Sequence, residues 1–299
     1  MLEKQLSAYG DVEVNESLAN HTTFRVGGNC AYFIYPKNEL CLMRILDILK
    51  NEQLPYKIFG KGSNLLCSDD EYHGAILCLD RYMSEYYFEE DGTLVAQAGC
   101  SIILLAHEAM KRSFHGLEFA SGIPGTLGGA LFMNAGAYKS DMSGIVKSVF
   151  VLKDGICTWI DVSALDYSYR HSRFQKESDW IILGARCKLE SGNQKEIRDL
   201  MDSRRIRRMQ SQPLNKPSAG SMFRNPQGAQ AWELIEKIGY RGKRIGGAMV
   251  SEKHANFIIN EDHACANDIA ALVEEIQKKI KETFDIDLRT EVERFNWKI

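Results

Sequence analysis

The apolar residues of this chain follow two periods, one typical of helices and one typical of strands. Residues 38–53 place Leu42, Leu46 and Leu49 on one helical stripe, and Asn38 stands where it can cap the first turn. Ser101 stands in the same position before a second apolar helix. Helical patterns predict further helices over 101–114, 193–212, 231–238 and 267–284. The helix over 193–212 is the polar one.

Short runs rich in β-branched and aromatic residues predict strands between these helices. The runs cover 56–59, 75–79, 84–90, 94–99, 180–190 and the terminal stretch 286–295. Residues 145–162 have a hairpin pattern with Asp154-Gly155 at the turn, a pair that favours the tight turns of hairpins. The chain is therefore predicted to mix helices and strands.

Length and composition predict a globular protein of two or three domains. The chain has 299 residues, of which 44% are apolar and 26% are charged. The amino-acid composition changes near Ser191, and a domain boundary is therefore expected between 190 and 215. The formal charge of −3 gives no overall attraction to nucleic acid or to an anionic membrane, so we expect neither as a partner.

Cysteine usage and the lack of long apolar stretches predict a cytoplasmic protein. The eight cysteines are scattered, with no CxxC pair and no cysteine–histidine cluster at zinc spacing. They are typical of buried thiols in a reducing compartment, and we expect no metal site. The first 21 residues lack the apolar core of a signal peptide, and no stretch approaches the roughly 20 apolar residues that span a bilayer.

Two glycine-rich stretches are candidates for binding a phosphorylated cofactor. "GKGSN" (60–64) follows a predicted strand and offers successive backbone N–H groups that could hold a phosphate. A GxG sequence after a strand is, however, more often a structural turn without a ligand. "SGIPGTLGG" (121–129) is a second loop of small side chains, followed by Asn134. Neither is a Rossmann or a Walker motif. Two such loops suit a bulky cofactor with a diphosphate, for which FAD is the natural candidate.

Several polar residues have both a structural and a functional interpretation. Arg170 and Arg173 in "DYSYRHSRF" are either solvated or one of them clamps a carboxylate or phosphate, and spacing does not say which. The arginines at 204–208 fit a solvated helix face better than an RNA site, because aromatic residues are lacking. Ser221 lies outside any GxSxG motif, and His107-Glu108 does not begin HExxH, so two hydrolase classes are disfavoured.

Seven motifs in order resemble the UDP-N-acetylenolpyruvoylglucosamine reductase family. They are "NHTTFRVGG" (20–28), "GKGSNLL" (60–66), "GLEFASGIPGTLGGALFMNAGAY" (116–138), "YSYRHSRF" (167–174), "AGSMFRNP" (219–226), "GGAMVSEKHANFIIN" (246–260) and "TEVERF" (290–295). The resemblance implies an α+β fold, in which two subdomains form an FAD-binding fold of the vanillyl-alcohol-oxidase type and a further α+β domain binds the substrate. It assigns 1–80 and 81–195 to FAD binding, 196–285 to the substrate, and 286–299 to a strand that returns to the FAD-binding part.

The resemblance also implies a reaction and its residues. NADPH would reduce FAD, flavin N5 would deliver hydride to the double bond of UDP-N-acetylglucosamine enolpyruvate, and Ser221 would supply the proton that completes UDP-N-acetylmuramate, a peptidoglycan precursor. The implied catalytic residues are Arg170, Ser221 and Glu291. Those implied for FAD are Gly60, Gly62, Ser63, Asn64, Leu65, Gly122, Pro124, Thr126, Gly129, Asn134, Ala137 and Arg208. Those implied for the substrate are Arg170, Ser221, Arg224, Asn225 and Lys253.

The chain departs from the family pattern in two places. Lys139-Ser140 stands where the family usually has glycine after Tyr138. The short gap between Phe174 and Trp180 leaves no room for the tyrosine-bearing loop of one subgroup, so the chain resembles the shorter subgroup. We also expect the protein to be a monomer. Two alternatives stay open: a flavin oxidase of the same fold, which often has a histidine near Ser63-Asn64 for covalent flavin attachment, and a sugar-nucleotide or RNA binder that uses the arginines at 204–208.

Overall fold

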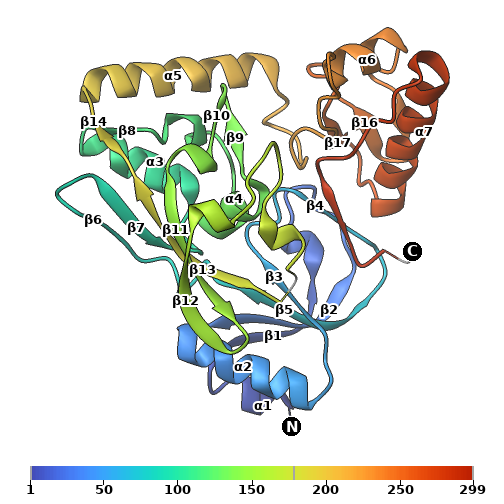
Figure 1. Ribbon diagram of the computed structural model, residues 1–299. Coiled ribbons are helices and arrows are strands. Elements are labelled where there is room, and N and C mark those ends of the chain that lie inside the picture. The colour runs from blue at the N-terminus through green and yellow to red at the C-terminus, as the bar shows by residue number, and fades with distance from the viewer. Residues whose placement is uncertain (1, 178, 298–299) are drawn as a thin grey trace. The chain divides into compact units, whose positions relative to one another are not determined.

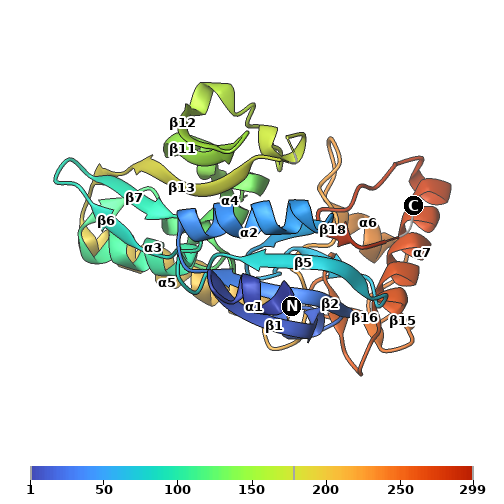
Figure 2. The same cartoon turned by 90° about the horizontal axis from the view of Figure 1, so that it is seen from below.

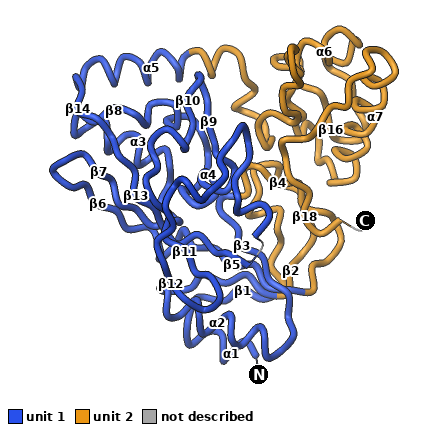
Figure 3. Tube along the Cα trace, viewed as in Figure 1, with its two compact units in different colours: residues 1–14, 32–61, 74–206 blue, residues 15–31, 62–73, 207–299 orange. Residues whose placement is uncertain are grey.

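The chain forms two compact units, and each is assembled from segments that lie far apart in the sequence. The computed structural model describes residues 2–177 and 179–297. Unit 1 comprises Met1–Val14, Tyr32–Lys61 and Gly74–Ile206, and unit 2 comprises Asn15–Ala31, Gly62–His73 and Arg207–Ile299 (Figure 3). These units are defined by how the segments pack and not by what they bind, so the boundaries of the expected cofactor and substrate domains remain a prediction.

The first sheet of unit 1 has four strands in the order β1-β2-β5-β3. Its elements are α1 (Leu2–Leu6), β1 (Gly10–Ser17), β2 (Asn29–Pro36), α2 (Glu39–Asn51), β3 (Tyr56–Phe59) and β5 (Tyr72–Cys78), of which β3 and β5 run parallel. The α2 helix runs along this sheet (Figure 2) and buries Leu42, Ile45 and Leu49 in the core. Asn38 caps it as predicted, because its Oδ1 accepts a hydrogen bond from the Cys41 amide at 2.9 Å.

The second sheet of unit 1 is antiparallel and has the order β12-β11-β13-β7-β6. Its strands are β6 (Tyr86–Phe88), β7 (Thr93–Gln97), β11 (Val146–Lys153), β12 (Ile156–Asp161) and β13 (Ile181–Lys188). The predicted hairpin is confirmed, and Asp154 and Gly155 have φ angles of 50° and 74°, as a type I′ turn requires. Both sheets contribute to one apolar core, in which Leu77 and Val149 are fully buried.

Helices and short strands complete unit 1. They are α3 (Ile102–Lys111), β8 (Phe114–His115), α4 (Leu127–Met133), β9 (Gly136–Ala137), β10 (Ser140–Asp141), β14 (Glu190–Ser191) and most of α5 (Gln194–Ser211). Ser101 precedes α3 as predicted, but its side chain makes no capping hydrogen bond, so its expected role as a cap is wrong. The 3-10 helices are Leu18–His21, Glu118–Ala120, Met142–Gly144, Val162–Ala164 and Arg173–Gln175.

Unit 2 is built on a small antiparallel sheet, β15 (Arg244–Ile245), β16 (Ala248–Val250) and β17 (Ile258–Asn260), beside which lie α6 (Ala231–Lys237) and α7 (Ala266–Phe284) (Figure 1). The terminal strand β18 (Glu293–Phe295) pairs in parallel with β4 (Leu65–Cys67). β18 is shorter than the predicted strand over 286–295. Among the described residues, no helix is both long and apolar enough to cross a bilayer.

Candidate functional site

The "GKGSN" loop has a backbone suited to holding an anion. Gly62 lies in unit 2 with a φ of +56°, and a Cβ at this position would come within 2.0 Å of the His21 carbonyl oxygen. Only glycine fits there without displacing backbone. Within the described part of the chain, the N–H groups of Gly62, Ser63 and Asn64 donate to no protein group. Uncommitted N–H groups in such a turn fit a bound phosphate.

The second glycine-rich stretch packs directly against the residue that begins this loop. Gly60 and Thr126 both belong to unit 1, and a Cβ on Gly60 would lie 2.6 Å from Thr126 Oγ1. The same oxygen accepts the Gly129 amide at 3.2 Å, which caps α4. Pro124, in the loop before Thr126, is exposed. The structure thus brings together two of the stretches that the sequence assigned to the cofactor.

Asn134 has a structural role that the sequence did not reveal. Its side chain is 1% exposed and it ends α4 in the left-handed region with φ 43°. Nδ2 donates to the Ser168 carbonyl at 2.9 Å, and Oδ1 accepts the Ser143 amide at 3.0 Å. Both ends of the amide are therefore used to join three loops. Its assignment to FAD remains a prediction.

Arg170 lies beside another predicted cofactor residue, Ala137, within unit 1. Its Nη2 donates to the carbonyl of Gly136, the first residue of β9, at 2.7 Å. Its guanidinium also lies 5.1 Å from the centre of the Tyr169 ring. The residue has φ +55°, an uncommon value for a non-glycine residue that is often found at functional sites. The half-buried guanidinium is thus held on two sides.

Ser221 and Glu291 lie on adjacent antiparallel segments of unit 2. Phe223 forms an isolated bridge with Thr290, and the Glu291 amide donates to the Met222 carbonyl at 2.8 Å. Ser221 itself follows Gly220, which has φ +80°. Residues separated by 70 positions in sequence are therefore fixed side by side by backbone hydrogen bonds. Both side chains are half-buried.

Asn64, the last residue of the "GKGSN" loop, connects this loop to the pair of Ser221 and Glu291. Its Nδ2 donates to the Glu291 carbonyl at 3.1 Å, and its own carbonyl accepts the Glu293 amide at 3.0 Å. Leu65, which follows it, begins β4 and is paired with Glu293 of β18. Asn64, Leu65, Ser221 and Glu291 all belong to unit 2, and the structure gathers them as the motifs implied.

The predicted substrate residues of unit 2 differ in whether their side chains make hydrogen bonds within the protein. Asn225 Oδ1 accepts the Ala231 amide at 3.0 Å and so holds the start of α6. Lys253 Nζ donates to the Met209 carbonyl. Arg224 has a buried Nε with no hydrogen-bond partner in the described structure, and it lines a pocket of about 560 Å³ with Gln277 and Arg289. Their assignment to the substrate remains a prediction.

The arginines at 204–208 do not form a uniform solvated face. Within unit 1, the Arg204 guanidinium lies 4.7 Å from the centre of the Tyr138 ring, and its carbonyl accepts the Tyr138 hydroxyl at 3.2 Å. Arg208, in unit 2, donates from Nε to Gln212 Oε1 at 3.1 Å. Tyr138 and Lys139, where the family has glycine after the tyrosine, have φ angles of 55° and 64°. This turn therefore forms without that glycine.

The comparisons with known proteins agree with this arrangement. The protein from Anoxybacillus flavithermus named UDP-N-acetylenolpyruvoylglucosamine reductase is 41% identical over 285 residues, which are 95% of this chain and 94% of that protein. The protein of the same name from Bacillus subtilis is 40% identical over 285 residues, with the same shares of both chains. This chain belongs to the UDP-N-acetylenolpyruvoylglucosamine reductase family. The family is one of oxidoreductases, as the resemblance implied.

Two separate parts of this family member match known protein domains. Residues 30–160 match an FAD binding domain, and residues 212–295 match the C-terminal domain of UDP-N-acetylenolpyruvoylglucosamine reductase. The crystal structure of UDP-N-acetylenolpyruvylglucosamine reductase from Thermus caldophilus superposes with a TM-score of 0.83 at 31% identity, over 96% of this chain and 100% of that chain.

A distant match concerns the fold alone. Wild-type Phl p 4.0202, described as a glucose dehydrogenase, has a TM-score of 0.50 at 13% identity, over 64% of this chain and 44% of that chain. The predicted α+β fold, with an FAD-binding part of the vanillyl-alcohol-oxidase type and a separate C-terminal domain, is confirmed.

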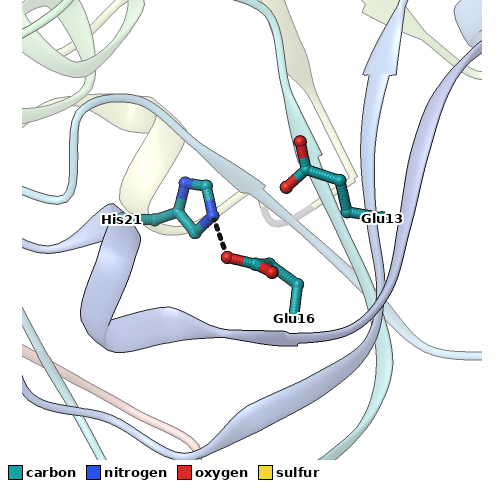
Figure 4. Close-up of side chains that lie close together, drawn as sticks. All are labelled: Glu13, Glu16 and His21. Atoms are coloured by element: carbon teal, nitrogen blue, oxygen red, sulfur yellow. Dashed lines mark hydrogen bonds and ion pairs between the residues drawn. The ribbon is translucent and has the colours of Figure 1, made fainter.

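The sequence of this reductase family member did not single out the pairing of His21 with Glu16. His21 Nε2 lies 3.0 Å from Glu16 Oε1 (Figure 4), and Asn20 donates to the same oxygen at 3.0 Å. The Asn20 hydrogen bond, followed by the interaction with His21, lowers the pKa of Glu16 below its usual range. His21 also supplies the carbonyl oxygen that a Cβ on Gly62 would approach, so this pair lies in the segment packed against the "GKGSN" loop.

Proposed function

We propose that this chain reduces the enolpyruvyl double bond of UDP-N-acetylglucosamine enolpyruvate, using FAD and NADPH, to give UDP-N-acetylmuramate for peptidoglycan synthesis. The observation that supports it most directly is the hydrogen bond from the Glu291 amide to the carbonyl of Met222, the residue after Ser221. Asn64 of the "GKGSN" loop in turn donates from Nδ2 to the Glu291 carbonyl at 3.1 Å. The name of the relatives supports the same substrate. Residues 1–195 would hold the cofactor, and 196–285 the substrate.

Bound FAD would supply the hydride chemistry, with NADPH as the source of the two electrons and the terminal carbon of the double bond as the hydride acceptor. Ser221 would donate its hydroxyl proton to the adjacent carbon, so that one O–H bond breaks and one C–H bond forms, and solvent would return a proton to the serine oxygen. A serine hydroxyl is a weak acid, but the carbanion that it protonates is a strong base. Arg170, together with Glu291 as a protonated hydrogen-bond donor, would stabilise the negative charge that develops on the substrate carboxylate.

The remaining assignments follow the motifs. The N–H groups of Gly62, Ser63 and Asn64 would hold the cofactor diphosphate. Arg208 would stabilise negative charge on the reduced flavin ring. Gly122, Pro124, Thr126, Gly129, Asn134 and Ala137 would close the cofactor site. Arg224, Asn225 and Lys253 would contact the sugar nucleotide.

An anaerobic experiment tests this function. The purified chain should be yellow, NADPH should bleach the flavin, and UDP-N-acetylglucosamine enolpyruvate should restore the colour with one equivalent of product. UDP-N-acetylglucosamine, which lacks the double bond, serves as the matched control and should restore nothing. A colourless protein, or a reduced flavin that the enolpyruvyl substrate does not reoxidise, would contradict the proposal.

The same preparation separates this function from a flavin oxidase of the same fold. Ser63 and Asn64 occupy the positions where such oxidases often have a histidine for covalent attachment of flavin. We therefore expect all flavin to leave the chain on denaturation in acid. Flavin that stays with the polypeptide, together with rapid reoxidation by oxygen, would favour the oxidase.

A further inference from the structure

Asn256 makes three hydrogen bonds to the two residues that follow Ser221. Its backbone carbonyl accepts the Met222 amide at 2.8 Å. Its side-chain Oδ1 accepts the Phe223 amide at 3.0 Å, and its Nδ2 donates to the Phe223 carbonyl at 2.8 Å. The side chain is 5% exposed, so water does not compete for these groups. One donor and one acceptor on the same side chain thus match one donor and one acceptor on Phe223.

Glu291 completes the hydrogen bonding of the same two residues. Its amide donates to the Met222 carbonyl at 2.8 Å, so the N–H and C=O groups of both Met222 and Phe223 are all satisfied. Asn256 supplies three of these four bonds and Glu291 supplies one. The segment after Ser221 is therefore held between Asn256 and the strand-like residues around Glu291. A shift of this segment by one residue would break the whole set.

Asn256 is itself firmly supported. The backbone N–H of Asn256 donates to His254 Nδ1 at 3.3 Å. Across the same turn, the backbone N–H of Ser251 donates to the Phe257 carbonyl at 2.8 Å. Ala255 and Phe257, on either side, are buried. The chain then continues directly into β17. Asn256 thus transmits the position of the sheet in unit 2 to the Ser221 segment.

We infer that Asn256 is a positioning residue for proton donation, because its side-chain amide holds Phe223, and its backbone carbonyl holds Met222, in the register that keeps Ser221 beside Glu291. This inference rests on the proposed function of Ser221. It deepens that function by naming a residue that acts through the backbone and does not touch the substrate. A misplacement of about 1 Å at a reacting group can lower a rate roughly 100-fold, so the loss of this clamp has a measurable effect.

The test compares Asn256→Ala with Asn260→Ala in the full-length protein loaded with FAD. Asn260 is a matched control, because its side chain also makes two hydrogen bonds in unit 2, to the Phe24 carbonyl at 3.1 Å and from the Ala264 amide at 2.8 Å. Stopped-flow measurements record flavin reduction by NADPH and flavin reoxidation by UDP-N-acetylglucosamine enolpyruvate separately. Hydrogen exchange at the Phe223 amide, which donates to Asn256 Oδ1, reports the side-chain contact directly.

We expect Asn256→Ala to slow reoxidation by about 10- to 100-fold, with reduction by NADPH within about twofold of the unmodified protein. Exchange at the Phe223 amide should accelerate at the same time, because this amide loses its acceptor. Asn260→Ala should leave both half-reactions within about twofold. Equal slowing of both half-reactions by Asn256→Ala, or behaviour equal to that of Asn260→Ala, would overturn the inference.

Two additional variants keep the outcome clear. Asn256→Asp preserves the volume and the acceptor for the Phe223 amide but removes the donor to its carbonyl, so it should show the same selective loss, and its failure to do so would also overturn the inference. Ser221→Ala tests the proposed function on its own. If Ser221→Ala fails to slow reoxidation selectively, the proton-donor role is wrong whatever Asn256 does; if it succeeds while both Asn256 variants behave normally, only the role of Asn256 is wrong.

Discussion

The Glu291 amide donates to the Met222 carbonyl at 2.8 Å and thereby fixes the backbone of Glu291 beside the residue that follows Ser221. A serine that acts as a nucleophile needs a base to remove its proton. A serine that donates a proton to a carbanion needs instead to keep that proton and to be held in place. The backbone pairing at Ser221 meets the second requirement.

Ser221→Ala is expected to act on one half-reaction only. Flavin reduction by NADPH should stay near normal, because the hydroxyl takes no part in it. Reoxidation by the enolpyruvyl substrate should fall by roughly 100- to 10,000-fold, the usual contribution of a general acid. Ser218→Ala, in the same loop, is the control in stopped-flow absorbance measurements. An equal loss in both half-reactions would refute the role of Ser221.

Gly60→Ala is expected to weaken FAD binding by about 1–3 kcal/mol, the usual cost of overpacking. The added Cβ would lie 2.6 Å from Thr126 Oγ1 and would force the two glycine-rich stretches apart. Flavin fluorescence in a titration of deflavinated protein measures the affinity. Gly144→Ala is the matched control, because a Cβ there meets no atom within 4 Å. Equal affinities of the two variants would exclude close packing at Gly60.

Asn134→Ala is expected to lower the free energy of unfolding by about 1–3 kcal/mol, because the Ser168 carbonyl loses the hydrogen bond from Asn134 Nδ2, whereas the Ser143 amide keeps its bond to Asp141 Oδ1 at 3.1 Å. Asn134→Gly loses the same bonds but tolerates φ 43° more readily. It should therefore be more stable than Asn134→Ala by about 1 kcal/mol. Urea denaturation measures both, and the reverse order would show that backbone strain is unimportant here.

His254 is expected to make stability depend on pH. Burial, followed by the charge of Arg241, lowers the pKa of His254 below its ordinary value of 6.5. The folded state therefore disfavours the proton that the unfolded state accepts. Its stabilising contribution is complete above pH 6.5 and is lost as the pH falls from there through the lowered pKa of the folded state.

Replacing His254 tests this linkage. The difference in unfolding free energy between the unmodified protein and His254→Phe should rise with pH below 6.5, by no more than about 1.4 kcal/mol per pH unit, and should be flat above it. Urea denaturation between about pH 5 and pH 8 supplies the measurement. A difference that does not change with pH would mean that His254 binds its proton equally well in both states.

Local signals predicted the parts of the fold that depend on neighbouring residues. Asn38 caps α2, and Asp154-Gly155 turns the hairpin, because each preference acts over a few residues. Strands β1 and β2 were missed, although "NCAYFIYP" has strand composition. Ser101 shows the limit of such signals, since it occupies the capping position without making the bond.

The site was predictable as a set of motifs but not as a set of contacts. The motifs indicated that Asn64, Ser221 and Glu291 share a function. They could not reveal that the Asn64 side chain bonds the Glu291 carbonyl, because the two residues are separated by 227 positions and no periodicity extends so far. Asn256 was invisible for the same reason, since its partners lie 33 positions earlier in the chain.

The pairing of β18 with β4 has a consequence for the order in which the protein is made. Among the described residues, Leu65–Cys67, next to the "GKGSN" loop, pair with Glu293–Phe295. A ribosome must therefore add all of residues 68–292 before this pair can form, and contacts of such long range close slowly. Tight flavin retention should consequently be a late event of biosynthesis, and a chain that stops before Glu293 should emerge without it.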